Sequence, residues 1–205
     1  DQGYVITSYY GLFGLNEVSW IIAQLTTLFV FLIIVNSINF IDGIDGLAIS
    51  EIIKTIILIE FFSASPTSLQ PIGILLVLSL IPLYYFNFKK SKKVFLGDAG
   101  SLLLGTLISI YIFYVLGEEY HFKEGMGLNK TLFVVLVILY PLLDLLRVFI
   151  LRIKGGVSPF IADQRHLHHI ILKYISSKHL LISIIIIGAE LLIFYSFYYL
   201  DSTIF

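Results

Sequence analysis

Six long apolar segments dominate the sequence and constrain the fold more than any other feature. They are residues 18–38, 47–62, 71–88, 101–116, 131–151 and 180–200. Each approaches the roughly 20 residues that a helix needs to cross about 30 Å of hydrocarbon. The mean hydropathy is +0.96 and only 13% of residues are charged, against roughly 25% in soluble proteins. We therefore expect an all-α fold, a polytopic membrane helix bundle with about six transmembrane helices.

The rest of the composition adds two limits. The sequence contains no Cys, which excludes disulfides, a thiolate nucleophile and a Cys metal site. We find no soluble domain and no internal repeat, so residues 1–205 are expected to belong to one multi-span membrane domain. The segment 47–62 differs from the other five because it is short and carries charged residues. Its Glu51 and Lys54 are three positions apart and could pair on one helix face.

The distribution of Lys and Arg predicts the orientation. If the spans alternate, one side receives the loops at about residues 36–48, 88–101 and 152–179, and the other side receives only Lys123 and Lys130. The basic residues of the first side are Lys89, Lys90, Lys92, Lys93, Arg152, Lys154, Arg165, Lys173 and Lys178. By the positive-inside rule this side is cytoplasmic. Three polar clusters lie in these loops, so they could form one site.

The first polar cluster, residues 36–48, follows directly after an apolar run. It contains two amides, Asn36 and Asn39, one helical turn apart, and two carboxylates, Asp42 and Asp45, each followed by Gly. Ionisable residues at the end of a membrane helix are costly to bury and indicate a functional site. The alternative is a polar loop that only caps two helices.

The second polar cluster, residues 94–101, places Asp98 between glycines, after four lysines and before an apolar helix. A carboxylate in such a place suits a hard cation that keeps several waters and is shared with a substrate phosphate. Ser101 and the free N–H groups at the helix start could receive phosphate oxygens. The alternative is that Asp98 acts only as a helix cap.

The third polar cluster, residues 158–169, contains Arg165, His166, His168 and His169. Zinc binding is one interpretation, but neither a Cys nor a Glu-bearing zinc-hydrolase helix accompanies the histidines. Anion handling is favoured, because His and Arg supply hydrogen bonds and charge to phosphates. A solvated basic loop remains the alternative.

Asp144 lies inside an apolar segment, with Arg147 one turn further on. Two interpretations are equally open: an ion pair within the membrane, or a residue of the site.

In their order along residues 20–171, the three clusters resemble the signature loops of the polyprenyl-phosphate N-acetylhexosamine-1-phosphate transferases. Members of this family use Mg²⁺ to move a sugar 1-phosphate from a UDP-sugar to a polyprenyl phosphate, with release of UMP. The matching motifs are Asn36-x-x-Asn39-x-x-Asp42-Gly43-x-Asp45-Gly46-Leu47-Ala48, Phe95-x-Gly97-Asp98-x-Gly100-Ser101 and His166-Leu167-His168-His169. The last motif resembles the branch that transfers N-acetylglucosamine 1-phosphate to undecaprenyl phosphate and starts envelope polysaccharides. The phospho-N-acetylmuramoyl-pentapeptide branch, which usually has three adjacent histidines, is an alternative.

The resemblance also implies roles. Asp98, with Asn39, is expected to hold Mg²⁺, with Mn²⁺ as a substitute. The residues assigned to catalysis are Asp42, Asp45, Asp98, His166, His168 and His169, and those assigned to substrate binding are Asn36, Asn39, Gly97, Ser101 and Arg165. The expected partners are a UDP-N-acetylhexosamine, undecaprenyl phosphate and membrane lipid, without nucleic acid; a homodimer is left open. The expected location is the inner (cytoplasmic) membrane, with the site on its cytoplasmic face.

One departure from the family pattern matters. The family carries an Asp-Asp motif on an earlier cytoplasmic loop, and this sequence has no adjacent Asp pair. The resemblance therefore implies that the chain is the C-terminal part of the domain, and we expect it to be inactive or nearly so by itself. Two other classes of protein compete with the transferase: a membrane transporter and a non-catalytic scaffold. Both leave the three motifs unexplained. A transporter would also place its polar groups near the midplane of the membrane.

Overall fold

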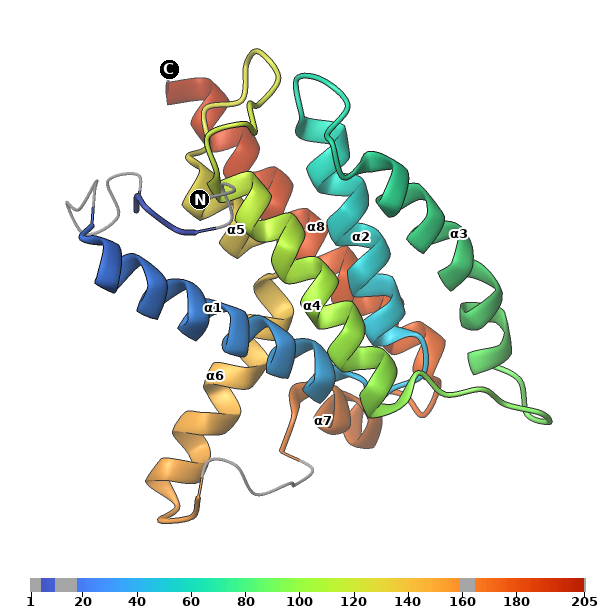
Figure 1. Ribbon diagram of the computed structural model, residues 1–205. Helices are drawn as coiled ribbons and strands as arrows, with labels where there is room; N and C mark the ends of the chain where they lie inside the picture. The colour runs from blue at the N-terminus through green and yellow to red at the C-terminus, as the bar shows by residue number, and fades with distance from the viewer. Residues whose placement is uncertain (1–4, 10–17, 159–164, 205) are drawn as a thin grey trace.

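The computed structural model describes residues 5–9, 18–158 and 165–204, which form eight helices (Figure 1). The helices are α1 (Trp20–Ile41), α2 (Leu47–Phe62), α3 (Gln70–Asn87), α4 (Gly97–Leu116), α5 (Lys130–Val137), α6 (Leu139–Lys154), α7 (Leu167–Tyr174) and α8 (His179–Ile204). The all-α prediction is confirmed.

Among the described residues, four helices, α1, α3, α4 and α8, are long and apolar enough to cross a membrane. Helices α5 and α6 pass the same test only as a pair, which is bent by 76° where they meet at Ile138, so the count is five if this pair crosses as one span. Pro141 explains the bend, because it has no N–H and its ring would clash with the carbonyl of Val137. The chain is therefore a multi-pass membrane protein with fewer spans than the six expected.

Helix α2 accounts for the difference. Its 16 residues measure about 24 Å, less than the thickness of the hydrocarbon. It packs against α3, α4 and α8, and residues such as Ile52 and Ile59 are fully buried (Figure 1). Most side chains of α2 are buried by protein, although Ile57 and Phe61 are exposed, so its length need not match the bilayer all round. It still runs between the two ends of the bundle, since Ser63, just after it, pairs with Phe122 of the loop that follows α4.

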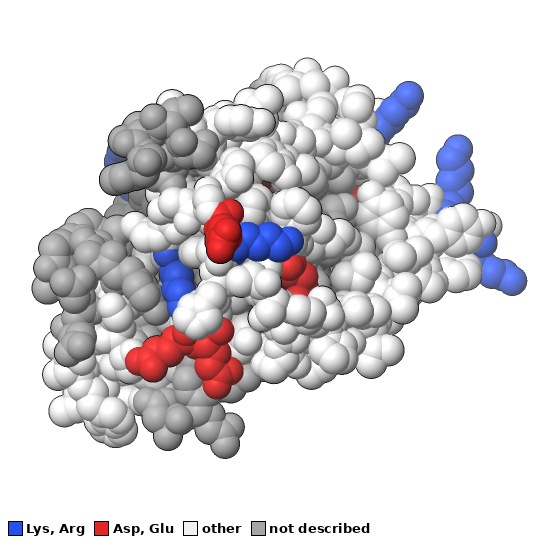
Figure 2. All heavy atoms as spheres, turned by 90° about the horizontal axis from the view of Figure 1, so that it is seen from above, with Lys and Arg blue, Asp and Glu red and all other residues white. Residues whose placement is uncertain are grey.

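That loop, residues 117–129, lies at the end of the bundle shown uppermost in Figure 1. It carries Glu118, Glu119 and Lys123. Seen from this end, the described surface is mostly uncharged, with acidic and basic side chains near its middle and toward one side, and further basic side chains that project at the right-hand edge (Figure 2).

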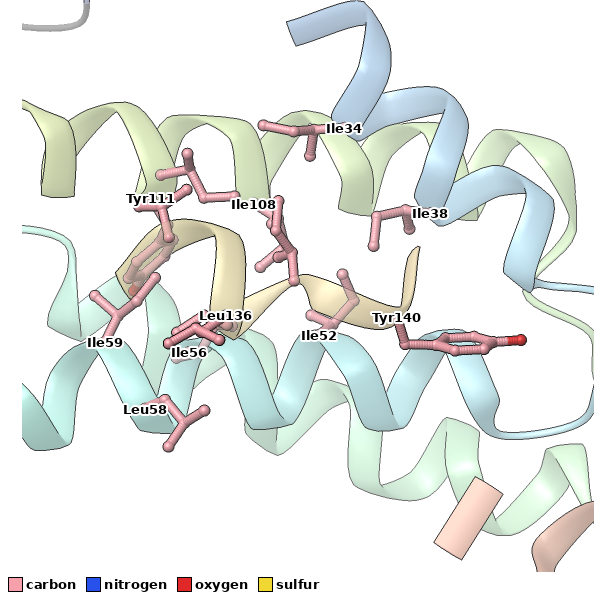
Figure 3. Packing of buried hydrophobic residues seen from close by; sticks show 14 of the residues in the cluster. Ile34, Ile38, Ile52, Ile56, Leu58, Ile59, Ile108, Tyr111, Leu136 and Tyr140 are labelled. Carbon is pink, nitrogen blue, oxygen red and sulfur yellow. The ribbon is translucent and has the colours of Figure 1, made fainter. Parts of the chain in front are cut away.

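Helices α1 and α4 approach each other closely near Gly105. A Cβ atom at this position would lie 2.9 Å from the Cα atom of Val35, so a larger residue would push the helices apart. Ile34 and Ile38 of α1 extend toward Ile108 of α4 in the same core (Figure 3). This packing brings the end of α1, with the first polar cluster, beside the start of α4, with the second.

A buried ion cluster connects α2, α8 and the start of α6. Lys54 Nζ lies 2.6 Å from Glu51 Oε2, which confirms the expected pair, and 2.6 Å from Glu190 Oε2 of α8. Glu190 Oε1 accepts a hydrogen bond of 2.7 Å from the backbone N–H of Tyr140. The bend at Ile138 leaves this N–H without a partner in its own helix. Glu190 therefore stabilises the bent pair of helices.

Replacing Lys54 by Met is expected to lower the free energy of unfolding by about 3–5 kcal/mol, because it leaves the buried carboxylates of Glu51 and Glu190 without a counter-charge. Thermal unfolding in detergent measures the change. Lys90→Met is the matched control, since Lys90 is exposed. Equal melting temperatures for the two variants would show that the cluster does not stabilise the bundle.

Candidate active site

The first two polar clusters meet where α1 ends and α4 begins. Asn39 Nδ2 donates a hydrogen bond of 2.8 Å to Ser101 Oγ and lies 3.4 Å from Asp98 Oδ1. Ser101 is fully buried, whereas Asp98 is exposed. Because the Asn39 nitrogen makes these contacts, its amide oxygen is the atom that could reach a bound cation.

Asp42, just after α1, joins the same group. Its carboxylate accepts a hydrogen bond from the backbone N–H of Gly97, a residue whose φ of 67° favours glycine. The pKa of Asp42 is raised from 3.8 to about 7, mainly by burial; the Gly97 N–H lowers it, and the nearby charges of Asp98 and Asp45 contribute to the rise. Negative charge is therefore concentrated here.

These residues fit the expected Mg²⁺. Asp42 and Asp98 offer carboxylate oxygens and Asn39 an amide oxygen, which are the donors that this cation prefers. In the described part of the chain, no three His, Asp or Glu side chains are grouped so that they could hold a metal ion by themselves. The group thus suits a cation that keeps waters and is completed by substrate phosphates.

The raised pKa of Asp42 predicts a pH-dependent stability. In metal-free buffer the folded state holds a proton on Asp42 up to about pH 7, whereas the unfolded chain releases it near pH 3.8. Between these two pH values the folded state binds more protons than the unfolded state, so its stability falls as the pH rises. Asp42→Asn removes the effect. The melting temperature of Asp42→Asn should therefore rise relative to that of the parent as the pH increases from 5 to 8.

Thermal unfolding at several pH values measures this difference. Glu119→Gln, at an exposed carboxylate in the loop after α4, is the control and should show no such trend. A constant difference for Asp42→Asn would contradict the assignment of a buried, repelled carboxylate.

The third polar cluster is held by Asp144 of α6. Asp144 Oδ2 lies 2.6 Å from His166 Nδ1, and its Oδ1 accepts a hydrogen bond of 2.6 Å from the backbone N–H of Leu167. Arg147 instead donates to the carbonyl oxygen of Arg165, at 2.6 Å. Of the two interpretations left open for Asp144, the structure favours a residue of the site.

His168 and His169 lie against the first cluster. A Cβ atom on Gly43 would lie 2.9 Å from His168 Nε2 and 3.3 Å from His169 Nε2, so both rings pack on the backbone next to Asp42. His168 is fully buried, and its Nδ1 is 2.9 Å from the hydroxyl of Tyr140. Burial lowers the pKa of His168 to about 3, which keeps the ring neutral at physiological pH.

An open cleft of about 830 Å³ adjoins these histidines. His169 lines it together with three cationic side chains, Arg147, Arg165 and Lys173. Arg and Lys at such a place can neutralise phosphate groups. Arg165, predicted to bind substrate, is therefore beside the histidine motif.

Two predicted site residues, Asn36 and Asp45, make side-chain contacts outside the group of Asn39, Asp42 and Asp98. Asn36 is exposed and donates to the carbonyl of Leu32 in its own helix. The Asp45 carboxylate lies 2.6 Å from Lys93 Nζ and 2.9 Å from His179 Nδ1. The roles proposed for Asn36 and Asp45 stay predictions, and residues 159–164 of the third cluster lie outside the described residues.

Sequence reasoning missed two polar residues that position the clusters, Asn87 and His179. Asn87 Oδ1 accepts from the Gly46 N–H at 2.6 Å and Asn87 Nδ2 donates to the Val94 carbonyl at 2.8 Å, which joins the first cluster to the second. His179 holds Asp45. Both lie at the end of an apolar segment, which is the signal that could have identified them.

The fold and the site define a multi-pass membrane protein in which acidic, amide and histidine side chains meet at one end of the bundle. Residues 2–116, more than half of the chain, match the model of the family described as Glycosyl transferase family 4. The chain belongs to this family, and the resemblance drawn from the three motifs is confirmed.

Two relatives illustrate the similarity. The chain is 32% identical over 196 residues to the decaprenyl-phosphate N-acetylglucosaminephosphotransferase of Mycobacterium leprae (strain TN), covering 84% of this chain and 48% of the relative. It is 31% identical over 153 residues to the undecaprenyl-phosphate alpha-N-acetylglucosaminyl 1-phosphate transferase of Escherichia coli (strain K12), covering 72% of this chain and 40% of the relative. The chain thus spans about half the length or less of these relatives.

Proposed function

We propose that the protein transfers N-acetylglucosamine 1-phosphate from UDP-N-acetylglucosamine to undecaprenyl phosphate and releases UMP. The observation that carries the proposal is the approach of His168 and His169 to Gly43, directly beside the carboxylates of Asp42 and Asp98. The names of both relatives, which specify N-acetylglucosamine and a polyprenyl phosphate, support it.

The chemistry requires mainly alignment and charge neutralisation. A phosphate oxygen of the carrier attacks the phosphorus that bears the sugar, the bond from that phosphorus to the bridging oxygen breaks, and UMP leaves with that oxygen. Asp98, Asn39 and Asp42 would hold Mg²⁺, which neutralises charge on the diphosphate when bound. His168, His169 and Arg165 would donate hydrogen bonds to the phosphate oxygens.

The bundle offers a route for the lipid carrier from the membrane. Leu143, Leu146 and Ile150 are exposed apolar residues of α6, the helix that also carries Arg147 of the cationic cleft. A polyprenyl chain could lie on such a surface while its phosphate enters the cleft. The basic loops support placing this end on the cytoplasmic face of the inner membrane.

Release of UMP tests the proposal. Membranes with the protein at its natural length would receive UDP-N-acetylglucosamine, undecaprenyl phosphate and Mg²⁺, with and without EDTA. We expect release that requires the lipid, stops with EDTA and returns with Mg²⁺ or Mn²⁺. UMP release with only another UDP-N-acetylhexosamine would assign a different sugar donor. UMP release only with decaprenyl phosphate would assign a different lipid carrier. Solute uptake into proteoliposomes without UMP release would favour a transporter.

A further inference from the structure

His168 has a buried nitrogen without a partner. The residue is 0% exposed, and its Nε2 makes no hydrogen bond to any described residue. This atom points at Gly43, where a Cβ atom would lie only 2.9 Å away. A buried polar atom without a partner is costly, so one that faces a candidate site indicates a ligand atom.

The other nitrogen of His168 identifies what that ligand atom must be. Nδ1 lies 2.9 Å from the Tyr140 hydroxyl, whose oxygen also accepts from the backbone N–H of His168, so the hydrogen of that hydroxyl still needs an acceptor. If Nδ1 carried the hydrogen, the buried Tyr140 hydrogen and the Nε2 lone pair would both lack a partner. If Tyr140 donates to Nδ1, only the Nε2 hydrogen lacks one. The second arrangement leaves fewer buried groups unpaired.

We propose that Tyr140 is a positioning residue that holds His168 as the neutral tautomer with its hydrogen on Nε2, ready to donate to a phosphate oxygen of the substrate. This inference rests on the proposed function, since it assigns a donor for the diphosphate. Asp144, which binds His166, lies one turn beyond Tyr140, and the His166 ring stacks on the His168 ring with centroids 5.4 Å apart.

The membrane part of the bundle fixes Tyr140. Its backbone N–H donates to Glu190, and Glu190 pairs with Lys54 of α2. In Figure 3 the Tyr140 hydroxyl points away from the neighbouring aliphatic side chains, while its backbone lies among them. A connected series of contacts therefore runs from the buried ion cluster through Tyr140 to His168.

Nitrogen NMR reads the tautomer without turnover. The full-length protein, labelled with ¹⁵N-histidine, would be compared with His168→Gln to assign the His168 signals. We expect the parent to show an unprotonated Nδ1 and a protonated Nε2, and Tyr140→Phe to show a mixture of tautomers. Tyr120→Phe is the matched control, because it removes another buried tyrosine hydroxyl, which donates to the Ile59 carbonyl. A hydrogen on Nδ1 in the parent, or an unchanged tautomer in Tyr140→Phe, would overturn the proposal.

Two further readouts complete the test. Inorganic pyrophosphate with Mg²⁺ should shift the Nε2 signal of the parent, and no shift would overturn the assigned donor. Tyr140→Phe should lower kcat about 10- to 100-fold, as is usual when the partner of a site residue is lost, with little change in KM for the UDP-sugar. A kcat equal to that of Tyr120→Phe would overturn the proposal. A parent that releases no UMP with any UDP-sugar would refute the proposed function alone, because the tautomer and the pyrophosphate shift are still measured.

Discussion

Asp98→Asn is expected to lower the rate of UMP release by roughly 100- to 1000-fold at any Mg²⁺ concentration. The amide keeps the size of the side chain and its neighbours Asn39 and Ser101, but it removes a negative charge from the group that we propose holds the cation. Asp42 would then be the one carboxylate left in that group, beside the amide of Asn39. A series of initial rates over a wide range of Mg²⁺ concentrations measures the effect.

Two comparisons make this result specific. Glu119→Gln removes a carboxylate at the opposite end of the bundle and should keep the parent's rate. Ser101→Ala removes the hydroxyl that accepts from Asn39 and should have a smaller effect than Asp98→Asn, because it leaves the charge in place. Near-normal turnover by Asp98→Asn would reject its assignment to the metal.

Gly43→Ala is expected to reduce transfer about 10- to 100-fold and to destabilise the fold by about 1–3 kcal/mol, the usual cost of overpacking. The added methyl group would lie 2.9 Å from His168 Nε2 and 3.3 Å from His169 Nε2. His168 is fully buried and bound to Tyr140, so it cannot move aside without breaking that contact. The histidine cluster would therefore separate from the carboxylates.

Turnover and thermal unfolding together test this second expectation. Gly188→Ala in α8 is the matched control, because a Cβ atom there would meet no other atom within 4 Å. An alanine inside a helix should keep activity and stabilise it by up to about 1 kcal/mol. Parent-like activity of Gly43→Ala would mean that the approach of the histidines to Gly43 is not needed for transfer.

The features that the sequence predicted depend on neighbouring residues. An apolar run of about 20 residues is sufficient to indicate a membrane helix, as for α1 and α4, and alternation of the spans then places the three loops at one end. The hydrogen bond from Asn39 to Ser101 and the contact of Gly43 with His168 agree with that placement.

The features that could not be predicted from the sequence depend on residues far apart in the chain. Lys54 meets Glu190 across 136 positions, and His179 reaches Asp45 across 134, and no local pattern encodes either pairing. The burial of most of the short helix α2 by other helices cannot be read from its composition. The bend at Ile138 did have a local signal in Pro141.

Hydrogen exchange of the full-length protein in lipid nanodiscs tests most directly the central claim that the three polar clusters form one site. Backbone exchange would be measured with and without UDP-N-acetylglucosamine and Mg²⁺. The account predicts slower exchange in residues 36–48, 94–101 and 165–174 together, with no change in residues 117–129. Protection of only one of the three clusters, or equal change in residues 117–129, would contradict it.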